Sequence, residues 1–83
     1  MKVSIEISMY PLNQNFIAPI VAFIERLNEH PTIEVSTNHM STHIFGDYDI
    51  VMPILQKEMK ESFLQDENTV MVVKFIGRDV REI

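Results

Sequence analysis

Polar side chains that can hydrogen-bond a small molecule gather in one short stretch near the middle of the chain. Thr37, Asn38, Ser41 and Thr42 fall on or beside a tight connection between two predicted strands. Such a connection needs only one or two turn-forming residues, so this run of hydroxyl and amide groups exceeds the requirement. A ligand with several polar edges would use these groups, whereas a plain polar hairpin would use them to cap its own backbone. Spacing alone leaves both interpretations open.

Two histidines, His39 and His43, are four residues apart in the same stretch. That spacing joins two metal ligands on a helix, but alternation along a hairpin turns the side chains to different faces. We expect His39 at the turn and His43 on the open face of a sheet. No third ligand with clear spacing accompanies them, so we predict no metal site.

Nothing in the chain indicates catalysis or a cofactor. No nucleophile elbow surrounds any serine, and Gly46 and Gly77 are too far apart to cradle a phosphate. The chain has no cysteine, which excludes disulfides and thiol chemistry. A net charge of -5 disfavours nucleic-acid binding, which requires a basic stripe. We therefore predict a protein that is not an enzyme and does not bind nucleic acid.

The expected location is the cytoplasm. No apolar run approaches the roughly 20 residues that span a bilayer, so we expect no membrane contact. The N-terminal residues alternate between apolar and polar and include an early acid, Glu6, unlike a secretory signal.

The elements that would position the polar stretch follow from hydrophobic periodicity. Alternation predicts strands over residues 3–10, 33–37 and 42–46, helical spacing predicts helices over 16–27 and 48–63, and 69–76 is an apolar strand. Right-handed crossovers and a short hairpin connect this order as a ferredoxin-like βαββαβ sandwich. We predict one α+β domain over residues 1–83, with a four-stranded antiparallel sheet of order 4-1-3-2 and both helices on one face.

The predicted apolar stripe of the first helix is Phe16, Ile17, Ile20, Val21, Ile24 and Leu27, and that of the second is Tyr48, Met52, Leu55, Met59 and Phe63. Capping residues and prolines refine both helices. Asn13 or Asn15 can cap the first helix, and Asp47 or Asp49 the second. Pro53 falls inside the second apolar stripe and predicts a late start or a kink. The last strand is apolar on both faces, so we expect it to be covered on both sides.

The predicted core lies between the sheet and the helices. It comprises Ile5, Ile7, Ile20, Ile24, Ile33, Val35, Ile44, Leu55, Met59 and Val73. The other face of the sheet would show Glu6, Ser8, Tyr10, Glu34, Ser36, His43, Phe45, Val70, Val72 and Lys74. A monomer seldom leaves such a mixture of polar, aromatic and aliphatic groups in water. We therefore expect a homodimer or homotetramer that covers this face.

Three short motifs then indicate a family. Ser8, Tyr10 and Pro11 end the first strand in a Ser-x-Tyr-Pro pattern, and a Thr-Asn pair is followed by a Ser-Thr pair. This combination resembles the YkoF-like branch of the thiamine-binding protein superfamily, which consists of small ferredoxin-like modules. Asn38 stands where that branch tends to have aspartate.

The resemblance implies non-catalytic binding of thiamine or its hydroxymethylpyrimidine half. Its matching positions give the candidate ligand-binding residues Ser8, Tyr10, Thr37, Asn38, Ser41 and Thr42. Tyr10, Phe45 and Tyr48 are the candidate aromatic walls, although Tyr48 also fits a core position on its helix.

Two departures from the family pattern matter. Phe45 replaces the glutamate that precedes glycine in the wider group, and this chain has one module where the YkoF-like branch has two in tandem. A homodimer would have to supply the second module. The alternative function is a regulatory or assembly module that uses its open sheet face for protein–protein contact.

Overall fold

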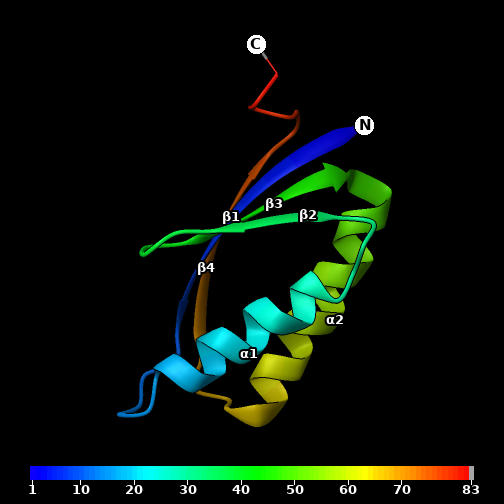
Figure 1. Cartoon of the computed structure of the whole chain (residues 1–83). Helices are drawn as coiled ribbons and strands as arrows, with labels where there is room; N and C mark the ends of the chain where they lie inside the picture. The colour runs from blue at the N-terminus through cyan, green and yellow to red at the C-terminus, as the bar shows by residue number, and fades with distance from the viewer. Residues whose placement is uncertain (83) are drawn as a thin grey trace.

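Four strands form one antiparallel sheet in the computed structural model, which describes residues 1–82. The strands are β1 (Lys2–Tyr10), β2 (Glu34–Thr37), β3 (Thr42–Asp47) and β4 (Val70–Ile76). Two helices, α1 (Ile17–Asn28) and α2 (Tyr48–Gln65), pack on one face of the sheet (Figure 1). The sheet order β2-β3-β1-β4 is the predicted order read from the opposite edge. The ferredoxin-like prediction is therefore confirmed.

The register of β1 determines which side chains share a face. Ile5 pairs with Ile44 and Ile7 pairs with Thr42, while Glu6 between them pairs with His43. Successive side chains of a strand point to opposite faces. The isoleucines therefore face the helices, and the Glu6–His43 pair lies on the open face.

The core lies between the sheet and the two helices. Five predicted core residues are buried, namely Ile5, Ile7, Ile33, Ile44 and Leu55. The other five are partly buried, namely Ile20, Ile24, Val35, Met59 and Val73. Val3, Phe23, Leu27 and Val51 complete the buried cluster.

The predicted apolar stripe of α1 is partly wrong. Phe16, Ile17 and Val21 are 51%, 63% and 44% exposed, because α1 turns an adjacent side toward the sheet. That side carries Phe23 and Leu27, which are four residues apart and therefore lie one above the other. The stripe of α2 is overextended in the same way, since Tyr48 is 40% exposed and is not a core residue.

The two helices begin differently. Phe16 is the N-cap of α1 and makes no side-chain cap, so neither predicted asparagine caps that helix. Asn13 instead donates through Nδ2 to the Asp66 carboxylate at 2.8 Å. Asp47 caps α2 as predicted, accepting a hydrogen bond from the Asp49 amide. Of the two alternatives predicted from Pro53, the late start is wrong, because the helix begins at Tyr48 and contains Pro53, and the kink stays a prediction.

A buried ion pair joins the two helices. Arg26 of α1 donates from Nε to Glu58 Oε1 at 3.1 Å and from Nη2 to the Ser62 hydroxyl at 2.7 Å. His30 Nε2 lies 2.7 Å from Glu58 Oε2. Burial alone would raise the pKa of Glu58, but the hydrogen bonds from His30 and Arg26 outweigh it and lower that pKa. The pair fixes how α1 lies against α2.

The edge strand β4 is less covered than predicted. Val70 and Val72 on the open face are 44% and 59% exposed, and Phe75 on the helix face is 49% exposed. Within one chain the open side of this strand is uncovered, so its coverage by another subunit stays a prediction. Within residues 1–82, neither helix combines the length and apolar character needed to cross a bilayer.

Candidate functional site

A cavity of about 110 Å³ opens between the β2–β3 hairpin, α1 and β1, and we call it the hairpin pocket. It is lined by Ile7, Met9, Ile20, Phe23, Ile24, Thr37, Asn38, His39, Met40, Ser41 and Thr42. Its inner wall is apolar and its rim carries hydroxyl and amide groups. None of these lining residues is Asp, Glu, Lys or Arg.

Asn38 builds the turn that forms one side of the hairpin pocket. Its Oδ1 accepts hydrogen bonds from the amides of Met40 at 2.8 Å and Ser41 at 2.9 Å. The Asn38 amide also donates to the Ser41 carbonyl at 3.1 Å. This is the backbone-capping role of a polar hairpin, which accounts for the oxygen of Asn38 and leaves its Nδ2 as a donor.

Thr37 and Thr42 place two hydroxyls side by side on the helix-facing side of the sheet. The residues pair across the hairpin, and their Oγ1 atoms lie 3.3 Å apart. Thr42 is only 6% exposed. Because either hydroxyl can donate or accept, the pair can match a donor or an acceptor on a ligand.

Ser41 links the hairpin to the open face. Its Oγ donates to Glu6 Oε2 at 3.2 Å and lies 3.0 Å from His43 Nε2. Ser41 therefore lines the hairpin pocket while its hydroxyl belongs to a polar group on the opposite side of the sheet.

Ser8 and Tyr10 lie away from the hairpin pocket. Both point to the open face, where Ser8 pairs with Val72 and Tyr10 with Val70. Tyr10 is 50% exposed. The structure thus brings four of the six predicted ligand-binding residues to one cavity and places the other two on the opposite face.

Phe23 supplies the aromatic wall of the hairpin pocket, and the sequence analysis missed it. Neither Tyr48 nor the other two candidate walls, Tyr10 and Phe45, line this cavity. The signal that could have found Phe23 is its place in the i, i+3, i+4, i+7 set Ile20, Phe23, Ile24 and Leu27.

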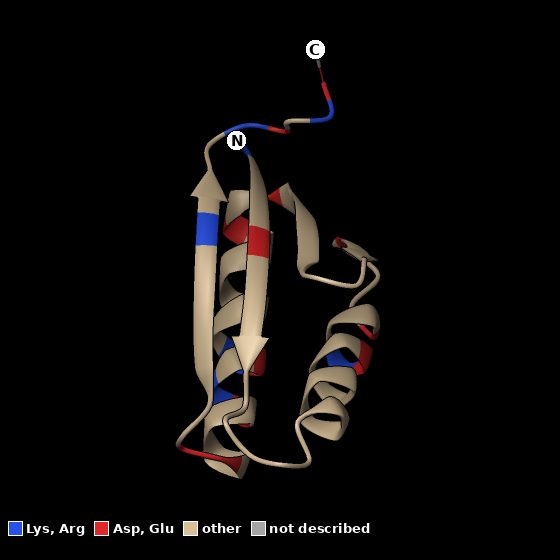
Figure 2. Ribbon diagram, turned by 90° about the vertical axis from the view of Figure 1, so that its left-hand side faces the viewer, with Lys and Arg blue, Asp and Glu red and all other residues tan. Residues whose placement is uncertain are grey.

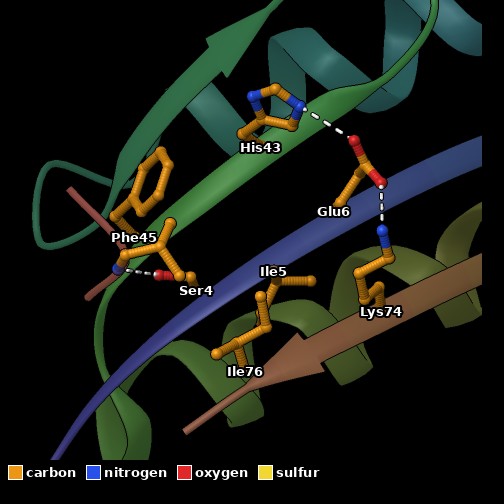
Figure 3. Close-up of a pocket in the computed structure, with 8 residues that line it drawn as sticks. Ser4, Ile5, Glu6, His43, Phe45, Lys74 and Ile76 are labelled. Carbon is orange, nitrogen blue, oxygen red and sulfur yellow. Dashed lines mark hydrogen bonds and ion pairs between the residues drawn. The ribbon is translucent and has the colours of Figure 1, made fainter. Parts of the chain in front are cut away.

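A second cavity, of about 230 Å³, lies on the open face, and we call it the tail pocket. It is lined by Ser4, Ile5, Glu6, His43, Phe45, Lys74, Ile76 and Val80 (Figure 3). Charged residues are sparse on the strands and gather on the helices and the C-terminal tail (Figure 2). Glu6 and Lys74 are an exception, since they form a pair of opposite charges in the middle of a largely uncharged sheet.

Glu6 is the centre of the polar group in the tail pocket. Lys74 Nζ lies 3.3 Å from its Oε1, and His43 Nε2 lies 3.2 Å from its Oε2. Hydrogen bonds from Lys74, then Ser41 and His43, lower the pKa of Glu6. His39 is exposed at the turn and His43 lies on the open face, as alternation predicts. Residues 1–82 contain no cluster of three or more acidic or histidine side chains that could hold a metal ion.

Residues 2–76 match the YKOF-related family. This chain belongs to that family. The match covers all six strands and helices and stops where β4 ends, so the C-terminal tail that reaches the tail pocket lies outside it. A search of curated protein sequences gives no match.

Solved structures share the fold of this YKOF-related protein. A Streptococcus pneumoniae protein is 26% identical, with a TM-score of 0.87 over 100% of this chain and 93% of its own. A Thermotoga maritima protein, provisionally described as a thiamine biosynthesis/salvage protein, is 14% identical, with a TM-score of 0.79 over 90% of this chain and 82% of its own. A hypothetical protein from Methanocaldococcus jannascii is 24% identical, with a TM-score of 0.79 over 98% of this chain and 84% of its own.

Proposed function

We propose that this protein binds thiamine or its hydroxymethylpyrimidine half, without catalysis, in the hairpin pocket. The observation that carries the proposal is the convergence of Thr37, Asn38, Thr42 and the buried Phe23 on one cavity, whose lining also includes Ser41. Membership of the YKOF-related family and the likeness to a protein linked with thiamine salvage support the choice of ligand.

The uncharged lining of the pocket favours the neutral pyrimidine ring over the cationic thiazolium. A cavity of ~150 Å³ in a protein core accepts benzene, so a cavity of about 110 Å³ holds at most part of one ring, and the rest of the ligand would lie outside it. Its lining holds no carboxylate to meet a permanent cation. The neutral pyrimidine would stack near Phe23, and the cationic half would remain in solvent.

The polar rim matches the edge of such a ring. A pyrimidine presents ring nitrogens that accept and an exocyclic amine that donates. The Thr37 and Thr42 hydroxyls supply both functions, and Nδ2 of Asn38 adds a donor. A buried polar edge on the ligand would thus find partners, which is the condition for burying it without a large cost.

Calorimetric titration of the wild type with thiamine and with hydroxymethylpyrimidine tests the proposal. We expect Thr42→Val to weaken binding by roughly 5- to 150-fold, since losing a hydrogen bond to a buried group costs ~1–3 kcal/mol. Asn38→Ala is less informative, because it also removes the two turn hydrogen bonds. Absence of heat with either compound at high micromolar concentration would contradict the proposal.

Thr69→Val is the matched control. Thr69 is also buried, it does not line the hairpin pocket, and its hydroxyl makes no hydrogen bond within residues 1–82. The same substitution there removes no interaction and should leave the affinity unchanged. Equal losses at Thr42 and Thr69 would indicate a general effect of the substitution and not a contact with the ligand.

We also propose that a second copy of the chain covers the β4 patch, formed by Tyr10, Val70 and Val72. These residues expose apolar surface beside the edge strand, which favours self-association and would also suit the assembly function. Val72→Asp should dissociate the oligomer without unfolding the subunit. Sedimentation of the wild type as a clean monomer at micromolar concentration would contradict this part of the proposal.

A further inference from the structure

We propose that the tail pocket is a second binding site, separate from the hairpin pocket, for a small zwitterion with an apolar side chain, such as a free aliphatic amino acid. The two cavities lie on opposite faces of the sheet, and the tail pocket is about twice as large, at about 230 Å³ against 110 Å³. The proposal rests on the charges, the walls and the construction of this cavity.

The charges favour a ligand that carries both signs. Glu6 Oε1 and Lys74 Nζ lie 3.3 Å apart on neighbouring strands (Figure 3). A ligand with a single charge would meet an attracting and a repelling group at similar distances, so the two Coulomb terms would nearly cancel. An ammonium beside Glu6 and a carboxylate beside Lys74 gain from both terms and leave the net charge of the site unchanged.

Both charged groups have capacity for a ligand. The Glu6 carboxylate offers about four lone-pair sites, and three donors, from Lys74, Ser41 and His43, use it now. Lys74 has three N–H donors and is 67% exposed at its side chain, so most of its capacity faces solvent. The existing ion pair is exposed and therefore weak, which makes it easy for a ligand to enter it.

The other walls of the tail pocket are apolar. Phe45 and Ile76 flank Ser4 on the neighbouring strands, and Val80 of the C-terminal tail covers the same end. A ligand whose charged groups sit on Glu6 and Lys74 would thus place its remaining atoms against an aromatic ring and two aliphatic side chains. Glycine, which has no side chain, would leave these walls unused.

Hydrogen bonds hold the C-terminal tail, whose Val80 forms one wall of the tail pocket. Ser4 Oγ accepts from the Val80 amide at 3.0 Å and donates to the Arg78 carbonyl at 2.8 Å, which buries Ser4 to 4% exposure. These bonds connect residues more than 70 positions apart in the chain, and they place Val80 over the sheet.

Arg81 completes the fastening of the tail. Its guanidinium lies 4.1 Å from the centre of the Phe45 ring and pairs with Asp79 at 2.8 Å and Glu34 at 2.6 Å. The tail is therefore tied to β1, β2 and β3.

A titration of the full chain followed by ¹⁵N NMR tests the proposal, with L-leucine as the probe. We expect saturable shifts at the amides of Glu6, His43, Lys74 and Val80, and none at Thr37 or Thr42. 3-Methylbutylamine lacks the carboxylate, 4-methylpentanoate lacks the ammonium and glycine lacks the apolar group. Each should bind at least tenfold more weakly than leucine.

Two variants make the test specific. Glu6→Gln keeps the shape of the side chain but removes the partner of the ammonium, and should weaken leucine binding at least tenfold. Glu61→Gln makes the same change at an exposed position of α2 and should have no effect.

Three outcomes would overturn the proposal. One is the absence of open-face shifts with leucine up to roughly 10 mM, a concentration that detects even a millimolar affinity of about -4 kcal/mol. This outcome would also arise if a second copy of the chain filled the tail pocket. The others are equal binding of the singly charged analogues and unchanged binding by Glu6→Gln. Thiamine binding in the hairpin pocket is independent of all three.

Discussion

The two faces of the sheet use the same strands in different ways. On the helix-facing side, Ile5, Ile7 and Ile44 are each at most 2% exposed and pack beneath α1 and α2. On the open side, the β1 side chains become more exposed along the strand. Ser4 is buried, the charged Glu6 is partly exposed and Tyr10 is half exposed. One face is completed by the chain itself, and the other presents groups to something else.

This difference shows where the protein can carry binding residues without weakening its hydrophobic core. The helix-facing side holds the core, so its residues are constrained by packing, and a cavity opens at its rim beside the hairpin. The open side contributes little to the core and can carry a charged pair, an apolar patch and a docked tail. We therefore expect substitutions in the helix-side core to alter stability, substitutions at the hairpin rim to alter binding in the hairpin pocket, and substitutions on the open side to alter association and binding in the tail pocket.

The largest expected effect is the loss of a core side chain. Leu27 is 0% exposed, so Leu27→Ala should lower the free energy of unfolding by about 2–5 kcal/mol, through lost burial and a residual cavity. Ile17→Ala on the exposed side of the same helix should change it by less than about 0.5 kcal/mol. Urea unfolding measures both, and similar losses in the two variants would contradict the assignment of the buried side of α1.

A smaller effect is expected from the ion pair between the helices. Glu58→Gln keeps the size of the side chain but removes the charge that faces Arg26 and His30, and should cost roughly 1–3 kcal/mol at pH 7. A thermal unfolding series measures the loss. A variant as stable as the wild type at pH 7 would show that burial of this carboxylate cancels its attraction to the two bases.

The same pair predicts a dependence of stability on pH. The pKa of Glu58 is lowered below its usual value of 4.5 by folding, so its contribution is complete above pH 4.5 and is lost as the pH falls through the folded pKa. The difference in unfolding free energy between wild type and Glu58→Gln should therefore shrink below pH 4.5. A constant difference between pH 6 and pH 3 would mean that the carboxylate does not titrate with this shift.

The smallest effect is local and concerns the tail. Hydrogen bonds from the Arg81 side chain and backbone lower the pKa of Asp79 to about 2 from 3.8, so acid should release the tail only between those values. Asp79→Asn should loosen the tail at neutral pH, with faster exchange of the Val80 amide and unchanged global stability. Glu82→Gln is the control. If the Val80 amide exchanges at the same rate in the wild type, Asp79→Asn and Glu82→Gln, the Asp79 carboxylate does not hold the tail in place.

The topology and the hairpin could be predicted because their signals are local. Alternation of apolar and polar residues in β1 determines which side chains share a face. The spacing between the Thr-Asn and Ser-Thr pairs marks the rim of the hairpin. Both signals depend only on residues that are close in the sequence. The buried side of α1 was only partly predictable. Ile17 and Val21 form a second apolar stripe beside the set that contains Phe23, and the sequence does not say which of the two meets the sheet.

The tail pocket could not be predicted from pattern. Its wall depends on contacts between Ser4 and Val80, which are 76 residues apart, and between Arg81 and Glu34, which are 47 apart. Neither a serine in a strand nor a short charged terminus indicates such a contact by its spacing. For the same reason the sequence placed Ser8 and Tyr10 in one group with the hairpin residues, although the sheet separates them.

The most direct test of the proposed function is an NMR titration of the ¹⁵N-labelled chain with hydroxymethylpyrimidine. The account predicts saturable shifts at the amides of Phe23, Thr37, Asn38 and Thr42, which line the hairpin pocket, and weaker binding in Thr42→Val. It predicts no shift at Lys74 or Val80, on the other face of the sheet. Shifts confined to the open face, or none at high micromolar ligand, would contradict the assignment of the ligand to the hairpin pocket.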